Sequence, residues 1–395
     1  MVQWLRVEKG CAWPSHELCF FNWKWYLDND CPERVSLVCS EAAVNGHLEV
    51  LKWVHENGCP WDPSTCSQAA EGGHLEVLKW AREHGCNWSA STCVSAARKG
   101  HLEVLKWARQ NGCDWSPYVC AQAAANGHWE VLKWAREQGC PWNEEACSCA
   151  AKNGQLEVLK WLREHGCPWD KSTCAGAARS GDLDLLQWVR AQGCQWDEET
   201  CIAAAQHLEV LKWVRANGCP WNEKVCSWAA VWGQLEALKW ARENGCPWNE
   251  KEVCIWAATR GQLEVLKWAR ENGCEWDEKV ITLKAARAGN LDLLKWMEEN
   301  CCLLNDAHQE EFHKKVCEQA ASGGRLKVLK WMKEIGCFHL KEICGKAAKY
   351  GHLDVIKWAR QQSEDGVLDV DQLRDIAEER GQEHVVGWLC EHFFI

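Results

Sequence analysis

The sequence predicts an all-α repeat solenoid, and three observations support this fold class. The segment GHLEVLKW recurs with small variations, and its glycine returns every 27 residues, at Gly46, Gly73, Gly100, Gly127, Gly154 and Gly181. Each interval contains two stretches whose apolar side chains follow the helical period, and no stretch alternates convincingly as a strand. A fixed period of about 20 to 50 residues is typical of solenoids, in which each unit buries its apolar face against its neighbours.

The repeat extends over nearly the whole chain. Its glycine continues at Gly233, Gly261, Gly289, Gly324, Gly351 and Gly381. The unit at 201–213 lacks the glycine and is two residues short, so we expect an irregular helix junction there. We expect one array over residues 1–395, with degenerate repeats at 1–45, main repeats at 46–360 and a C-terminal capping repeat at 361–395. The first unit begins mid-repeat at Trp4, which leaves open an upstream effector segment.

Residues 62–88 illustrate one unit. Asp62 is a good N-cap for a first helix, which the small pair Ala69–Ala70 allows to approach its neighbours closely. This helix should end at Gly73, a position that suits the left-handed C-cap conformation. A second helix is predicted from about Leu75 to Glu83. Its apolar side would be formed by Leu75, Val77, Leu78, Trp80 and Ala81, and its solvent side by Glu76, Lys79 and Glu83.

Composition excludes several classes of protein. The chain has 56 acidic against 45 basic residues and a net charge of −11, which disfavours nucleic acid or an anionic membrane as the main ligand. The charged N-terminus lacks the apolar core of a secretory signal, and no stretch approaches the roughly 20 apolar residues of a transmembrane helix. We therefore expect a soluble, cytoplasmic monomer.

The unit resembles the ankyrin repeat, whose signature combines T-P-L-H-x-A with A-x-x-G-H-L-E and G-A-D. Matching positions are Thr65, Ala69, Ala70, Gly73, His74, Leu75, Glu76 and Gly85, and the departures are Cys66, Trp80 and Cys86. The unit is shorter than the roughly 33 residues of that family, and the missing part is the β-turn finger between repeats. The chain is most similar to the short, Trp- and Cys-rich ankyrin-like arrays of brown algae, oomycetes and giant viruses. The resemblance implies a helix-turn-helix solenoid with shortened inter-repeat loops.

The 28 cysteines fall mainly into two periodic rows. One row opens the first helices, and the other stands in the loops: Cys66, Cys93, Cys120, Cys147, Cys174, Cys201, Cys226 and Cys254, and Cys59, Cys86, Cys113, Cys140, Cys167, Cys194, Cys219, Cys246 and Cys274. The C-x6-C spacing does not suit structural zinc, and stacked helices lie too far apart for disulfides along a row. We interpret the cysteines as reduced core thiols, with a metal-binding or redox-responsive protein as the alternative.

Tryptophan and histidine also follow the repeat. Indoles recur in the second helix and in the loop, for example at Trp80 and Trp88, and are interpreted as packing between repeats. The histidine of GHLE, as at His74, is interpreted as a cap at the helix junction. One aperiodic stretch, residues 301–317, could place zinc ligands at Cys301, Cys302, His308, His313 and Cys317, but the two histidines are five residues apart, so we read it as a loop insertion without metal.

Signatures of enzymes are absent. The sequence has no Walker loop, no G-x-S-x-G, no H-E-x-x-H and no G-x-G-x-x-G after a strand. Its carboxylates lie on periodic surface positions, with no pair that stands out for acid–base catalysis. We expect no catalytic residue, no cofactor and no metal.

Function should lie where the repeat varies. In ankyrin arrays the two variable residues of A-A-x-x-G point towards the ligand on the concave face, and here this row is mostly basic or neutral, with Glu71 its only acid. The alternative is that these are solvated helix ends. The indoles Trp228, Trp232 and Trp256 leave the periodic rows and should form one patch beside the basic stripe, unless they belong to a bulkier core. We predict partner-binding residues at Arg98, Lys99, Lys152, Arg179, Trp228, Trp232, Trp256, Arg260, Arg287, Lys349 and Tyr350.

These predictions together indicate a non-enzymatic scaffold or adaptor. Trp and Arg are the favoured anchors of protein interfaces, and a basic stripe on an acidic body would steer an acidic partner. We therefore predict that the chain binds a protein, with an acidic surface, on its concave face.

Overall fold

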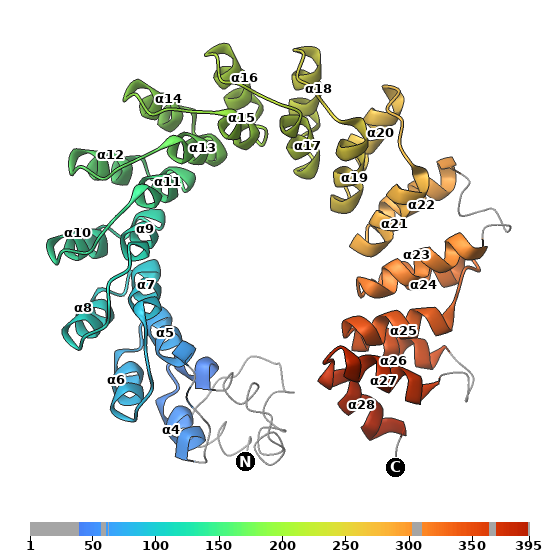
Figure 1. The fold of residues 1–395 in the computed structure, drawn as a ribbon, viewed down its shortest axis with the longest axis horizontal. Helices are drawn as coiled ribbons and strands as arrows, with labels where there is room; N and C mark the ends of the chain where they lie inside the picture. Colours follow the sequence, from blue (N-terminus) through green and yellow to red (C-terminus); the bar gives the residue numbers. More distant parts are fainter. Residues whose placement is uncertain (1–38, 57–60, 62, 302–309, 363–368, 394–395) are drawn as a thin grey trace. The chain divides into compact units, whose positions relative to one another are not determined.

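A computed structural model describes residues 39–56, 61, 63–301, 310–362 and 369–393. Within these ranges every regular element is a helix (Figure 1). Residues 1–38 of the degenerate repeats expected at 1–45, the cap Asp62 and the candidate ligands Cys302 and His308 lie outside the described residues. The chain divides into two compact units, residues 1–200 and 201–395, here called the N-terminal and C-terminal units. The single array expected over 1–395 stays a prediction.

In the N-terminal unit, first and second helices alternate as the sequence predicts. The first helices are α5 (Pro63–Gly72), α7 (Ala90–Lys99), α9 (Tyr118–Ala125), α11 (Glu144–Lys152) and α13 (Lys171–Ser180). The second helices are α4 (Leu48–Glu56), α6 (Leu75–Glu83), α8 (Leu102–Gln110), α10 (Trp129–Glu137), α12 (Leu156–Glu164) and α14 (Leu183–Ala191). The bounds of α6 are those predicted.

The C-terminal unit has the same alternation. Its first helices are α17 (Lys224–Val231), α19 (Glu250–Arg260), α21 (Glu278–Ala288), α23 (Glu310–Ser322), α25 (Leu340–Tyr350) and α27 (Val370–Glu379). Its second helices are α16 (Leu208–Ala216), α18 (Leu235–Glu243), α20 (Leu263–Glu271), α22 (Leu291–Cys301), α24 (Leu326–Glu334), α26 (Leu353–Gln361) and α28 (Glu383–Phe393). The helix α15 (Glu198–Ala204) crosses the boundary between the two units.

Packing is tighter along the first helices than along the second. In both units each first helix packs on the next one and on its own second helix, whereas successive second helices barely touch. The stack of first helices is therefore the short side of each unit, and each unit curves towards it (Figure 1). The face formed by first helices is the concave one within each unit.

Small residues make this close packing possible. The alanine pairs of the first helices, such as Ala150 and Ala151, are fully buried. A Cβ on Gly176 of α13 would lie 2.7 Å from the carbonyl oxygen of Ser148 in α11, so these two backbones are almost in contact. Between the helix layers the core is filled by aliphatic side chains of the second helices, such as Leu159, which is also fully buried. The core is thus a single repeated layer.

The histidine before a second helix, as at His128, does not cap its own helix. It bonds the end of a first helix in the preceding repeat. The His128 ring does not bond the N-terminus of α10; its Nε2 donates to the carbonyl oxygen of Arg98, 3.0 Å away, at the C-terminal end of α7 in the preceding repeat. His101 and His352 make the same bond to Glu71 and Ser322. The predicted capping role is therefore played between repeats.

The His128 ring also explains why a glycine stands at position 100, in the preceding repeat. Gly100 has a φ of +79°, and a Cβ there would lie 2.7 Å from Nδ1 of His128, whereas Gly112, with a φ of +85°, has open space around it. We expect Gly112→Ala to cost only the left-handed strain, about 1 to 2 kcal/mol. Gly100→Ala should cost about 1 kcal/mol more, because displacing the ring breaks its hydrogen bond. Urea unfolding of both variants measures the difference, and equal losses would contradict this role of the histidine.

The short repeat is irregular, as predicted. Its first helix, α15, has seven residues, against ten in α13. In a regular unit the amide of His101 bonds the carbonyl oxygen of Ala96, five residues back, but the amide of His207 bonds Ala204, three residues back. Without the glycine, the chain enters the second helix from a different, extended backbone conformation at His207.

Candidate functional site

The predicted basic side chains lie at the C-terminal ends of first helices. In the N-terminal unit these are Arg98 and Lys99 in α7, Lys152 in α11 and Arg179 in α13. Lys99, Lys152 and Arg179 are exposed and Arg98 is half-buried. A cation in the last turn of a helix is stabilised by the partial negative charge of the terminal carbonyl groups. This effect alone explains part of the pattern, so position by itself does not make these residues a binding site.

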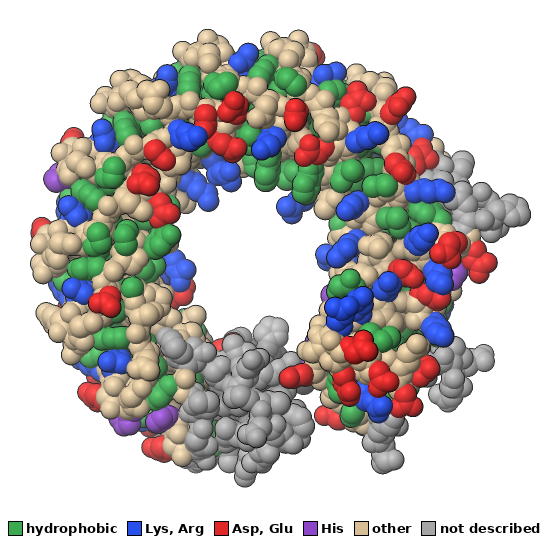
Figure 2. Space-filling model, in the orientation of Figure 1, with side chains coloured by type: hydrophobic (Ala, Val, Ile, Leu, Met, Phe, Trp, Pro, Cys, Tyr) green, Lys and Arg blue, Asp and Glu red, His purple; other side chains and the backbone are tan. Residues whose placement is uncertain are grey.

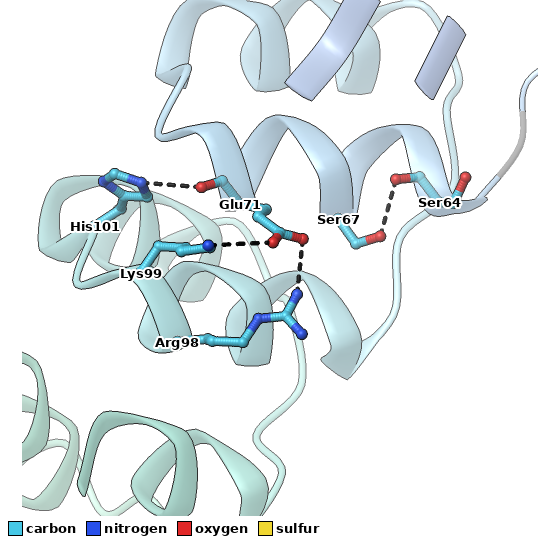
Figure 3. A network of polar contacts seen from close by, with 6 residues as sticks. All are labelled: Ser64, Ser67, Glu71, Arg98, Lys99 and His101. Carbon is cyan, nitrogen blue, oxygen red and sulfur yellow. Dashed lines mark hydrogen bonds and ion pairs between the residues drawn. The ribbon is translucent and has the colours of Figure 1, made fainter. Parts of the chain in front are cut away.

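Glu71 partly neutralises the stripe. Its carboxylate accepts a hydrogen bond from Arg98 at 2.7 Å and lies 3.7 Å from Nζ of Lys99 (Figure 3). The helix α5, which carries Glu71, packs against α7, so one acid contacts two cations of the next repeat. These three side chains together carry one net positive charge, and the exposed charge of the unit lies mainly on the later repeats.

In the C-terminal unit the predicted residues occupy the same positions. Arg260 and Arg287 end α19 and α21 and are exposed, and Lys349 and Tyr350 end α25. Tyr350 is exposed, and the Lys349 ammonium lies 5.9 Å from the centre of its ring, within the range of a cation–π interaction.

The three aperiodic tryptophans are at the surface. Trp228 is 41% exposed, Trp256 is 39% exposed and Trp232 is half-buried, so the alternative of a bulkier core is wrong. The centres of the rings of Trp228, in α17, and Trp232, which directly follows that helix, lie 5.0 Å apart. Trp256 lies on the adjacent helix α19, where its indole nitrogen donates to Glu252 at 3.2 Å. Figure 2 shows hydrophobic side chains gathered over α17 and α19.

The periodic tryptophans form a second, unforeseen surface. They do pack between repeats, but most remain half-exposed. The loop residue Trp88 packs edge-on against Trp107 of the next repeat, at 5.6 Å between ring centres. The Arg82 guanidinium lies over the Trp88 ring, 4.3 Å from its centre. The same arginine donates to the carbonyl oxygen of Cys86 at 2.6 Å. The arrangement recurs at Trp115, Trp142, Trp169, Trp221 and Trp248.

The cysteines of the two periodic rows lie in the core. All described thiols of the two rows are buried, and the described residues contain no disulfide. Burial raises the pKa of Cys254 and of Cys344 to about 12, so these thiols are protonated at neutral pH. The spacing along the sequence did not reveal that the two rows meet: Cys66 and Cys86, at opposite ends of one repeat, lie 3.2 Å apart at their sulfur atoms.

The described residues were also compared with the requirements of a metal site and of a membrane span. In the described ranges, no group of three His, Cys, Asp or Glu side chains could hold a metal ion. His313 and Cys337 lie 3.4 Å apart at Nδ1 and Sγ, buried between α23 and the loop after α24. Among the helices the structure describes, none is both long and apolar enough to span a bilayer.

Comparison with known protein families finds ankyrin repeats in one part of the chain. The family model described as "Ankyrin repeats (many copies)" matches residues 226–269. No curated protein matches the chain. Among solved structures 122 chains match, including the crystal structure of the human ASB11 ankyrin repeat domain, which is 17% identical over 40% of this chain and 84% of that chain, with a TM-score of 0.33. Residues 226–269, which run from α17 into α20, thus match ankyrin repeats. The described residues as a whole form an all-helical solenoid in which first and second helices alternate.

Proposed function

We propose that the chain is a non-enzymatic scaffold that binds a partner protein on the face formed by its first helices. The observation that carries this proposal is the pair of exposed indoles on α17 and α19, because two tryptophans that are 41% and 39% exposed have no role in the core. Large aromatic side chains left at a surface, near arginine, are the usual anchors of protein interfaces. Trp228, Trp232 and Trp256 would insert into the partner.

The basic helix ends give the partner its chemistry. Lys152, Arg179, Arg260 and Arg287 are exposed on first helices of a chain whose net charge is −11. Within each unit, positive charges on the first helices attract an acidic surface and repel a basic one, and this effect acts mainly on the rate of association. We infer an acidic protein partner, a monomeric scaffold and a cytoplasmic location, where the core thiols are reduced unless an oxidising disulfide is present.

The test locates the partner and then measures its association. A photo-crosslinking amino acid at position 232 would capture the partner, and the same residue at position 239 of the second helix α18 serves as the comparison. The captured protein is then mixed with a charge-reversed variant, Lys152→Glu, Arg260→Glu and Arg287→Glu. We expect its association rate at low salt to fall about tenfold or more, with a weaker dependence on salt.

A matched control carries the same change of charge elsewhere. Lys160→Glu, Lys212→Glu and Lys239→Glu lie on second helices, where each lysine pairs with a glutamate three residues earlier at 2.6 to 2.8 Å. Such exposed pairs contribute little to stability, so the control should fold and associate nearly as the wild type does. Equal slowing of both variants would show that only net charge matters, and an unchanged rate in both would refute the basic face.

A further inference from the structure

Each regular repeat places the thiol of its first helix against the thiol of the loop that ends the same repeat. In the repeat that begins with α5, Cys66 Sγ lies 3.2 Å from Cys86 Sγ, and both residues are 0% exposed. Twenty residues separate them along the chain, and the second helix α6 lies between them. The C-x6-C spacing in the sequence concerns a different pair, the loop cysteine and the cysteine of the next first helix.

The contact recurs in both units. In six further repeats the first-helix thiol and the loop thiol are close enough that their mutual hydrogen bonding shifts the pKa of at least one of the two: Cys93 with Cys113, Cys120 with Cys140, Cys147 with Cys167, Cys174 with Cys194, Cys201 with Cys219 and Cys226 with Cys246. The loop thiol is held in place from its other side as well. Cys113 Sγ donates to the carbonyl oxygen of Ser89 at 3.3 Å, and Cys194 Sγ to that of Asp170 at 3.2 Å, in each case at the start of the same first helix.

Two chemistries suit a pair of adjacent thiols, a soft metal ion and a disulfide. A two-coordinate metal would leave two thiolates and one univalent cation, hence a net negative charge, among alanines that are fully buried. The Arg82 guanidinium, which bonds the carbonyl oxygen of Cys86, would offset part of this charge, but burying the complex stays costly and the described residues offer no third ligand. A disulfide is neutral and apolar and also removes two buried S–H groups. The surroundings therefore favour the covalent bond.

We propose that these pairs are modification sites, at which a low-molecular-weight disulfide oxidises the two thiols of one repeat to an intramolecular disulfide. The loop thiolate attacks one sulfur of the small disulfide, a bond to that sulfur forms, and the other half leaves as a thiolate that takes up a proton. The helix thiolate then attacks the loop sulfur and expels the second half. One disulfide reagent is reduced to two thiols, and the protein loses two hydrogens per bond.

The geometry sets which partner moves and how fast. The sulfur atoms must approach from 3.2 Å to about 2.05 Å, a shift that the loop can make more easily than the packed helix. Both thiols are buried, and burial favours the unreactive protonated form, so the reagent reaches them when the loop opens. The product ties the loop to the first helix of its own repeat, which restricts local unfolding of that repeat.

The test uses the full chain, folded, with oxidised glutathione as the probe. After incubation, remaining thiols are alkylated, and proteolytic fragments are mapped by mass spectrometry. We expect bonds within repeats, such as Cys66–Cys86 and Cys93–Cys113, and none between Cys86 and Cys93. The oxidised chain should melt at a higher temperature, and dithiothreitol should reverse the shift.

Cys344 provides the matched control. It is a fully buried first-helix thiol like Cys66, but the sequence has Glu364 rather than a cysteine at the position 20 residues later, where the loop partner stands in the other repeats. It should remain alkylatable after unfolding in the treated sample. A second variant, Cys86→Ala, should leave Cys66 reduced. Free thiols at both Cys66 and Cys86 after oxidation of the folded chain would overturn the proposal, and so would bonds that join different repeats as often as they join one.

Discussion

Leu159→Ala should lower the free energy of unfolding by about 3 to 4 kcal/mol, because it removes a fully buried side chain from the single layer of the core. Leu159 lies at the centre of α12, between the helix and the first-helix stack, and its repeat has only its two neighbours to pack against. A solenoid has no distant core to compensate, so the loss falls on one repeat and its two interfaces.

Urea unfolding of the full chain, followed by far-UV circular dichroism, measures this loss. Leu156→Ala in the same helix is the control, because Leu156 is only half-buried and should cost about 1 kcal/mol. Hydrogen exchange should locate the weakened amides in α11 to α14. A loss at Leu159 no larger than at Leu156 would show that the core layer is not the main source of stability.

The fold could be predicted because each repeat carries its own signals. Positive-φ glycines, apolar spacing and alanine pairs act within one unit or between neighbours, and these local rules gave the bounds of α6. The thiol pairs could not be predicted in the same way. Whether Cys86 returns to Cys66 or reaches Cys93 depends on the path of the loop, which the periodic sequence leaves undetermined.

The candidate site was predicted less completely than the fold. The pairing of Glu71 with Arg98 had a visible signal, since Glu71 is an acid that stands one repeat before Arg98 in the same row. Equivalent positions of adjacent repeats are neighbours, so this ion pair follows from the period itself. The exposure of Trp228 and Trp256 had no such signal, because an indole on a first helix suits either a core or a surface until the neighbouring helices are in place.

Trp228, Trp232 and Trp256 are replaced by alanine one at a time. Each tryptophan that anchors the partner should contribute about 2 kcal/mol or more to binding, so its loss should raise the Kd roughly 30-fold. Trp228 and Trp256 are exposed and Trp232 is half-buried, so their loss should leave the fold intact, and circular dichroism and the melting temperature check this. The effect should appear in the dissociation rate, since the anchors act after encounter.

The control is Tyr118→Ala, an aromatic side chain that is 52% exposed on α9 of the N-terminal unit, outside the tryptophan cluster. Its removal should change the Kd by less than about threefold, because isolated exposed aromatic residues are common on monomers. If the three tryptophan variants bind like the Tyr118 variant, the cluster is not an anchor. If they instead lose association rate while the dissociation rate is unchanged, the indoles act on encounter and the basic row would have to supply the anchoring contacts.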